Sequence, residues 1–309
     1  MIYTVTLNPA IDKTIVIDEY RRNEVNRSMV SRKDVGGKGI NVSKVLKVLG
    51  VDSVCTGILG EENSNFFLDY LKSLKIENDF FKIPGENRTN IKIVEKNYET
   101  ITDINDRGFV IKKNEIDNFL DYFMKLVKEE DLVVLSGSLP EGLEADIYEE
   151  IIHRLKEKSV KVILDADGSP MINGIKAVPY AIKPNIHELQ NVVDVDEKDI
   201  NSVLKGGKKL IEKGIEKVLI SLGVEGAVYI TRNNSYYSNG MEVMVKSTVG
   251  AGDAMVAGLI YAMENNLSDF ETLKLAIACA TAKVMTEGTK IPDNETIKNI
   301  SKDIIVKSL

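Results

Sequence analysis

The sequence predicts an α/β protein whose mainly parallel central sheet is covered by helices on both faces. Two observations carry this prediction. From about residue 132 onward, short apolar runs alternate with segments of helical periodicity, as in consecutive strand–helix–strand units. These apolar runs are continuous rather than alternating with polar residues, which indicates strands that are buried on both faces. The chain of 309 residues is long enough to build such a core.

Each element of the predicted sheet is defined by a short apolar run. The predicted strands are Ile2–Leu7, Leu132–Leu135, Val160–Leu164, Tyr180–Ile182 and Lys217–Ile220. The predicted helices have the spacing of apolar residues that is typical of amphipathic helices. They are Ala145–Lys158, Lys198–Glu212, Asp253–Asn265, Asp269–Thr286 and Glu295–Asp303. Gly206 and Gly207 should weaken the second of these helices, and the sequence assigns them no function.

The segment after Gly226 has a different pattern. Three short apolar or aromatic runs, Ala227–Ile230, Ser235–Tyr237 and Met241–Val245, are separated by turn signals such as Asn239–Gly240. This pattern predicts an antiparallel meander of three strands.

Two segments in the first third of the chain do not fit the strand–helix alternation. Lys13–Ile17 and Thr89–Thr102 read as short alternating strands, the second broken at Lys96–Asn97. They predict a small sheet that stands off the main body. Such an insertion is either a lid that excludes water from a substrate site or an ordinary extension of a sheet edge, and the sequence leaves both open.

Composition and charge limit the function classes. The chain is 43% hydrophobic and 28% charged, with a net charge of −7 and a pI near 5.2. This acidic balance argues against a nucleic-acid partner, which needs a basic face. Cys55 and Cys279 are the only cysteines, so we expect a reducing compartment. With no leader pattern before Ile2 and no apolar run long enough to cross a bilayer, we expect a cytoplasmic protein with no membrane partner.

Two glycine clusters precede predicted helices. One is Gly36–Asn41, which contains Lys38, and the other is Thr248–Asp253. Glycines at the start of a helix let backbone N–H groups approach an anion closely. From the residues alone, Asp253 could be a helix cap or a catalytic group.

Neither cluster matches a known nucleotide fingerprint. A dinucleotide-binding motif would need glycine where Val42 stands, or glycine or alanine where Met255 stands. A P-loop would need serine or threonine in place of Gly39. A nicotinamide-dependent oxidoreductase therefore loses its main support, as does a P-loop enzyme.

Taken in order, the motifs resemble those of the ribokinase-like carbohydrate kinases, specifically the phosphofructokinase-B branch. The matching motifs are Thr6–Asp12, Gly36–Val42, Ser136–Pro140, Lys183–Asn185 with Glu188, Ser221–Gly223 and Thr248–Asp253. They span nearly the whole chain. The Leu7–Asp12 and Gly36–Asn41 segments are most similar to 1-phosphofructokinases and tagatose-6-phosphate kinases, and Thr102–Asn105 with Gly108–Phe109 is more similar to the former.

The resemblance implies a fold and a catalytic centre. The implied fold is a ribokinase-like three-layer α/β/α domain over residues 1–309, with lid strands inserted at about 11–35 and 86–107. Asp253 would be the base that accepts the proton of the attacking sugar hydroxyl. The N–H groups of Gly250, Ala251 and Gly252 would form an anion hole for the transferring phosphoryl group.

The resemblance also implies two sets of substrate-binding residues. Sugar-phosphate binding would involve Asp12, Gly37, Lys38, Asn41, Arg88, Gly137, Ser138 and Asp253, with Arg27 and Arg107 as further cations. ATP binding would involve Lys183, Asn185, Ser221, Gly223, Gly226, Gly250 and Gly252. Asn185 and Glu188 would organise Mg²⁺ through water, which suits the preference of magnesium for oxygen ligands and retained waters.

The implied activity is ATP-dependent phosphorylation of a ketohexose phosphate, fructose 1-phosphate first. Tagatose 6-phosphate and fructose 6-phosphate are the alternative acceptors. A remote alternative is a sugar-phosphate sensor without activity, which the intact Asp253 disfavours. The apolar alternation of the lid strands suggests a homodimer formed through the lid.

Overall fold

The computed structural model covers residues 1–309 and contains two β-sheets, one large and one small. The large sheet has ten strands, which lie in this order: β14 (Val306–Ser308), β13 (Ser235–Ser238), β12 (Ala227–Thr231), β11 (Lys217–Ser221), β10 (Ala181–Ile182), β9 (Lys161–Asp165), β8 (Leu132–Ser136), β1 (Ile2–Thr6), β4 (Val54–Gly60) and β5 (Glu77–Ile83). The strands from β11 to β5 are parallel to one another, and β12, β13 and β14 pair antiparallel. The predicted mainly parallel sheet is confirmed.

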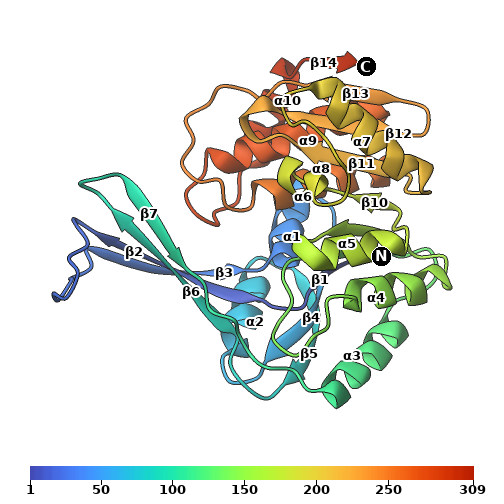
Figure 1. The fold of residues 1–309 in the computed structure, drawn as a ribbon. Helices are drawn as coiled ribbons and strands as arrows, with labels where there is room; N and C mark the ends of the chain where they lie inside the picture. The colour runs from blue at the N-terminus through green and yellow to red at the C-terminus, as the bar shows by residue number, and fades with distance from the viewer.

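Helices cover both faces of this sheet (Figure 1). One face packs against α3 (Lys113–Leu126), α4 (Ile147–Lys156), α5 (Gly168–Lys176) and α7 (Ile200–Glu212). The other face packs against α1 (Lys38–Leu49), α8 (Ala251–Glu264), α9 (Asp269–Val284) and α10 (Asn294–Asp303). The remaining helices are α2 (Ser64–Ser73), α6 (Ile186–Gln190) and the short 3₁₀ turn η1 (Gly223–Glu225). The three-layer α/β/α arrangement follows, because each buried strand face needs an apolar cover.

Close packing explains the two glycines inside α7. A Cβ atom at Gly206 would collide with the Val195 side chain, and one at Gly207 would collide with the Ile230 side chain on β12. The glycines therefore let α7 lie directly on the sheet, which compensates for their low helix propensity.

The predicted third strand of the meander, Met241–Val245, is wrong. This segment has no regular structure, and β13 pairs instead with the C-terminal strand β14. Three of its apolar side chains, Met241, Val243 and Val245, line a cavity described below instead of packing on a sheet. An alternating apolar pattern cannot distinguish these two uses.

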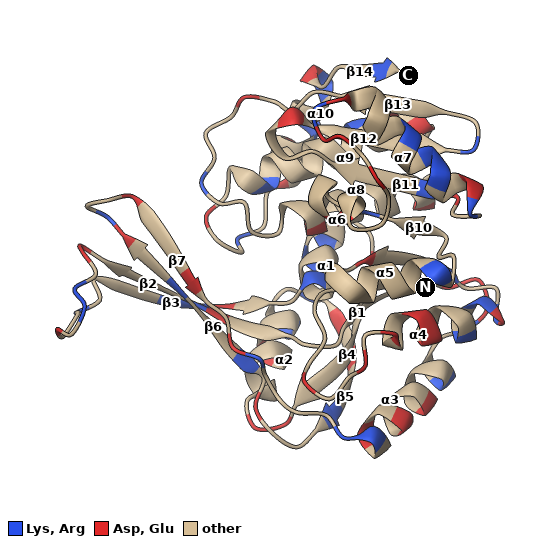
Figure 2. Ribbon diagram, viewed as in Figure 1, with Lys and Arg blue, Asp and Glu red and all other residues tan.

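The small sheet, here called the lid sheet, has four strands in the order β3 (Val30–Gly36), β2 (Ala10–Ile17), β6 (Arg88–Glu95) and β7 (Thr100–Ile104). Figure 1 shows it projecting from the body, and Figure 2 shows basic and acidic residues interspersed along it. β3 lies in the lid segment expected at about 11–35, but the apolar pattern did not mark it as a separate strand, because its sequence, Val-Ser-Arg-Lys-Asp-Val-Gly, carries little apolar signal.

The base of the lid sheet is anchored in the body. Ile11 of β2 and Val35 of β3 are buried in a separate apolar cluster with Phe67 and Leu71 of α2. This anchoring fixes the body-side ends of the lid strands beside the site described next.

No helix in the structure is both long and apolar enough to cross a membrane.

Candidate active site

Two adjoining cavities lie where the parallel strands end. The first, here called the polar cavity, has a volume of about 550 Å³ and receives residues from the carboxyl ends of β1, β8, β9, β10 and β11. The second, the apolar cavity, has a volume of about 450 Å³, and 11 of its 20 lining residues are hydrophobic. Asn185, Ser221 and Gly252 line both cavities, so the two lie side by side. Ligands of open α/β sheets bind at this edge.

Except for Arg27 and Arg107, every site residue expected from the resemblance lines one of these cavities. The polar cavity is lined by Asp12, Gly37, Lys38, Asn41, Arg88, Gly137, Ser138, Lys183, Asn185, Glu188, Ser221, Gly250, Gly252 and Asp253. The apolar cavity adds Gly223, Gly226 and Ala251. Arg27 and Arg107 line neither cavity, and Arg107 instead pairs with Glu141 at 3.7 Å.

Asp253 lies in the first turn of α8, which begins after Gly250. Gly250 has φ of 79°, a left-handed conformation that favours glycine, and it directs the chain into the helix. The N–H groups of the first helical turn have no partners within the helix, so they can bind an anion. The buried Asp253 carboxylate accepts a hydrogen bond of 2.9 Å from Asn41 Nδ2.

The electrostatic environment of Asp253 favours proton uptake. Burial raises the pKa of its carboxyl to about 6, and the nearby Asp165 carboxylate adds to this increase. Lys38, Asn41 and Lys183 oppose it only in part. A carboxyl group with a pKa close to neutrality is suited to general base catalysis.

Asp165 is a site residue that the motifs did not reveal. It ends β9 and is fully buried, and its Oδ1 lies 3.4 Å from Lys38 Nζ and 3.2 Å from Lys183 Nζ. Burial alone would raise the pKa of Asp165, but the two ammonium groups outweigh burial and lower it. The signal was available: Asp165 and Asp167 directly follow a buried strand, at the sheet edge where ligands bind.

Lys38 is held in the polar cavity as a cation. Its burial disfavours the charged form, but the carboxylates of Asp165 and Asp253 outweigh this effect and raise its pKa. Its side chain also lies beside Gly137, whose backbone has φ of 98°. Lys38 thus carries positive charge close to both β8 and the first turn of α8.

Arg88 and Asp12 bring polar groups from the lid sheet into the polar cavity. Arg88 Nη2 donates to the Asn8 carbonyl at 3.1 Å and to Ser138 Oγ at 3.0 Å, while its buried Nε has no partner. Asp12 accepts a 3.0 Å hydrogen bond from Asn90 Nδ2. Burial raises the pKa of Asp12, and the hydrogen bond from Asn90 opposes this increase in part.

Asn185 and Glu188 form a capping box at the start of α6. Asn185 Oδ1 accepts from the Glu188 N–H at 2.8 Å, and Glu188 Oε2 accepts from the Asn185 N–H at 2.7 Å. Glu188 Oε1 takes no part in this box, and the side chain lines the polar cavity. The pair therefore fixes the turn and still offers an oxygen ligand to the cavity.

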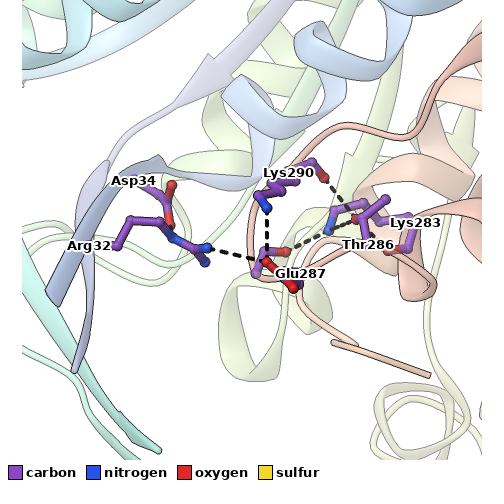
Figure 3. A network of polar contacts seen from close by, with 7 residues as sticks. Arg32, Asp34, Lys283, Thr286, Glu287 and Lys290 are labelled. Carbon is purple, nitrogen blue, oxygen red and sulfur yellow. Dashed lines mark hydrogen bonds and ion pairs between the residues drawn. The ribbon is translucent and has the colours of Figure 1, made fainter. Parts of the chain in front are cut away.

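A polar network connects β3 of the lid sheet to the end of α9 and the segment that follows it (Figure 3). The buried Lys283 Nζ donates to the Gly288 carbonyl at 2.6 Å and to Thr286 Oγ1 at 3.1 Å. Arg32 of β3 lies 3.9 Å from Glu287. The Lys283 side chain also packs against Gly250, where an added Cβ would be 3.2 Å from its Cε.

The chain is similar to known proteins over most of its length. The chain matches the pfkB family carbohydrate kinase over residues 5–297. It is 37% identical to the 1-phosphofructokinase of Escherichia coli K12 over 290 residues, covering 94% of this chain and 93% of that protein. It is 36% identical to the 1-phosphofructokinase of Borreliella burgdorferi over 286 residues, covering 92% of each chain.

The chain is also similar to a kinase named for a different sugar phosphate and to a solved structure. The tagatose-6-phosphate kinase of Staphylococcus epidermidis is 35% identical over 312 residues, with 99% of each chain covered. The crystal structure of Escherichia coli phosphofructokinase-2 in complex with substrates and products superposes with a TM-score of 0.92 at 22% identity, covering 97% of this chain and 98% of that one. The fold, the buried carboxylate at the start of α8 and these full-length matches agree: the chain is a sugar-phosphate kinase and belongs to the pfkB family of carbohydrate kinases.

Proposed function

We propose that the protein transfers the γ-phosphoryl group of ATP to the 6-hydroxyl of fructose 1-phosphate, forming fructose 1,6-bisphosphate and ADP. One observation carries the proposal. The buried Asp253 carboxylate lies at a helix N-terminus in a cavity that is also lined by Lys38 and Arg88, and this cavity adjoins an apolar one. Phosphoryl transfer requires a base for the acceptor hydroxyl, an anion site and cations for the phosphates, and a compartment for the nucleotide base.

In the proposed reaction, Asp253 takes the proton from the 6-hydroxyl as that oxygen bonds to the γ-phosphorus. The bond between the γ-phosphorus and the bridging oxygen breaks, and its electron pair leaves on ADP. Charge on the transferring group would be stabilised by the N–H groups of Gly250, Ala251 and Gly252. The Asn41 hydrogen bond holds the Asp253 carboxylate in position for this transfer.

The apolar cavity fits the adenine ring of ATP. Met255 and Ile277 line it from the helices, and Val243 and Val245 line it from the loop before Gly250. The nucleotide phosphates would then lie at Ser221 and Asn185, which line both cavities, and near Lys183 of the polar cavity.

The polar cavity also fits Mg²⁺ in the manner that the ion prefers. No three His, Cys, Asp or Glu side chains gather into a metal cage, so water and nucleotide phosphates would supply most ligands. Glu188 Oε1 and the Asn185 turn would orient those waters. When bound, the ion neutralises phosphate charge.

The acceptor phosphate would bind Arg88, Ser138 and Lys38, with Gly137 allowing close approach. The proposal is tested by coupled assays of ADP release with fructose 1-phosphate, fructose 6-phosphate and tagatose 6-phosphate. We expect the highest kcat/KM with fructose 1-phosphate. A preference for either 6-phosphate would change the acceptor and keep the mechanism. No ADP release with any acceptor would favour the sugar-phosphate sensor.

The activity should depend on pH in the acidic range. Asp253 must be ionised to accept a proton, and burial raises its pKa to about 6. We therefore expect kcat/KM to fall tenfold per pH unit below about 6, and to be nearly constant between pH 7 and 8. Initial rates at saturating ATP across pH 5–8 measure this. A flat profile down to pH 5 would contradict the base assignment.

We further propose that the protein is cytoplasmic and dimerises through the lid sheet. Both cysteines are free and buried, as suits a reducing compartment.

Ile101 and Ile104 of β7 are 59% and 54% exposed, which leaves apolar surface on the lid sheet for a second subunit. Light scattering should give twice the chain mass, and Ile101→Glu should give a monomer, unlike Ile305→Glu at an exposed site outside the lid. A monomeric wild type would refute the dimer.

A further inference from the structure

Lys44 on α1 is a buried charged residue for which no role has been given so far. It is 1% exposed, and its Nζ donates to the Val35 carbonyl and to Asn41 Oδ1, the latter at 3.1 Å. Its ammonium group also lies 5.0 Å from the centre of the Tyr70 ring. Buried lysines are rare because removing the charge from water is costly, so such a residue calls for a functional or structural reason.

The hydrogen bonds of Lys44 lead directly to Asp253. The Asn41 amide has two different ends: Oδ1 accepts from Lys44 Nζ, and Nδ2 donates to Asp253 Oδ2 at 2.9 Å. An ammonium group can only donate hydrogen bonds. Lys44 therefore selects one of the two amide orientations, the one that presents N–H rather than a carbonyl oxygen to the base.

We propose that Lys44 is a positioning residue for phosphoryl transfer, which fixes the Asn41 amide so that it holds Asp253 ionised and aimed at the acceptor hydroxyl. The inference rests on the proposed role of Asp253 as the base. With Lys44 removed, the Asn41 amide can rotate and present Oδ1 to Asp253. That arrangement is favourable only when Asp253 is protonated, because only then does it have a hydrogen to donate.

The charges around both groups set the direction of the effect. Lys44 faces the acidic groups Asp12, Asp34, Cys55 and Asp253, and a small cavity that it shares with Lys283 and Lys290. Asp253 faces Asp165, Lys38, Lys183 and Lys283. Burial lowers the pKa of Lys44 to about 8, so it is mostly protonated at neutral pH. Removing it should raise the pKa of Asp253, because a cation and a donated hydrogen bond both stabilise the carboxylate.

The test compares two variants. Lys44→Met keeps a side chain of similar length but removes its charge, whereas Lys44→Arg retains a charged hydrogen-bond donor. For Lys44→Met we expect kcat to fall about 10- to 100-fold. The acidic limb of the pH profile of kcat/KM should shift to higher pH by about one unit. The KM for ATP should be unchanged. Lys44→Arg should recover most of kcat and return the limb toward its wild-type position.

Lys158→Met is the matched control, because Lys158 also donates to two backbone carbonyls but lies outside both cavities. It should leave the acidic limb unchanged. Lys44→Met with a wild-type kcat and limb would overturn the proposal. An equal loss in Lys44→Met and Lys44→Arg with an unmoved limb would also overturn it, because that result indicates packing alone.

A second variant decides the matter if Lys44→Met does not fold. Asn41→Ala removes the intermediary and leaves Lys44 in place, so it should move the acidic limb in the same direction. An unmoved limb in a folded Asn41→Ala protein would overturn the proposal. The base assignment fails separately, through retention of activity in Asp253→Asn. Activity lost in that variant but unaffected in Lys44→Met refutes only the role of Lys44.

Discussion

Asp253→Asn is expected to lower kcat about 100- to 10,000-fold, the range that a general base contributes. Asparagine has the same shape and can still accept the hydrogen bond from Asn41 Nδ2, but it cannot take a proton. The KM for ATP should change little, because the apolar cavity proposed for the adenine ring is not lined by Asp253. Steady-state kinetics with fructose 1-phosphate and ATP measures both quantities. Near-wild-type turnover would remove Asp253 from the reaction.

The same variant should be more stable than the wild type at pH 8, which separates lost chemistry from lost folding. Burial raises the pKa of Asp253 from 3.8 to about 6, so its contribution to stability is present below pH 3.8 and is lost as the pH rises through 6. The ionised group then costs on the order of 3 kcal/mol. Asparagine avoids this cost. Thermal unfolding should show a larger gain at pH 8 than at pH 5, and a loss of Tm at pH 8 would contradict this account.

Much of the site could be predicted because the chemistry follows the ends of strands. Ser138, Lys183 and Ser221 each stand at or just after a buried strand, and parallel strands end at one edge of the sheet. The glycines before α8 marked the anion site for a similar reason, since the chain must turn sharply there. Local sequence therefore fixed the position of these groups along the chain, and the parallel sheet brought them together.

Other features depend on contacts that local sequence does not encode. Lys44 occupies an ordinary position in an amphipathic helix, and only the packing of α1 against β3 and α8 shows that its ammonium group is buried. Strand β3 is mostly polar: it pairs with β2 over seven residues, and Val35 is its one side chain in an apolar cluster. Met241–Val245 shows the opposite case, in which apolar residues line a cavity without forming a strand.

Arg88 should determine the preference for a phosphorylated acceptor. Its guanidinium group reaches the polar cavity from the lid sheet, fixed by Asn8 and Ser138, and its buried Nε has no hydrogen-bond partner. A buried unpaired donor is costly unless a ligand satisfies it. Guanidinium groups bind phosphate with two parallel hydrogen bonds, which an ammonium group cannot reproduce. We therefore expect the acceptor phosphate of the proposed substrate to bind at Arg88.

Arg88→Met is expected to lower kcat/KM for fructose 1-phosphate about 100- to 1,000-fold, as removal of one partner from a buried charge pair does. The loss should lie mainly in the KM for the sugar phosphate, because the phosphate is remote from the reacting hydroxyl. Arg88→Lys should recover only part of it. Unphosphorylated fructose is the control acceptor, since its weak turnover should be nearly equal in the wild type and in Arg88→Met. Equal losses with both acceptors would show that Arg88 supports the Asn8 and Ser138 loops rather than the phosphate.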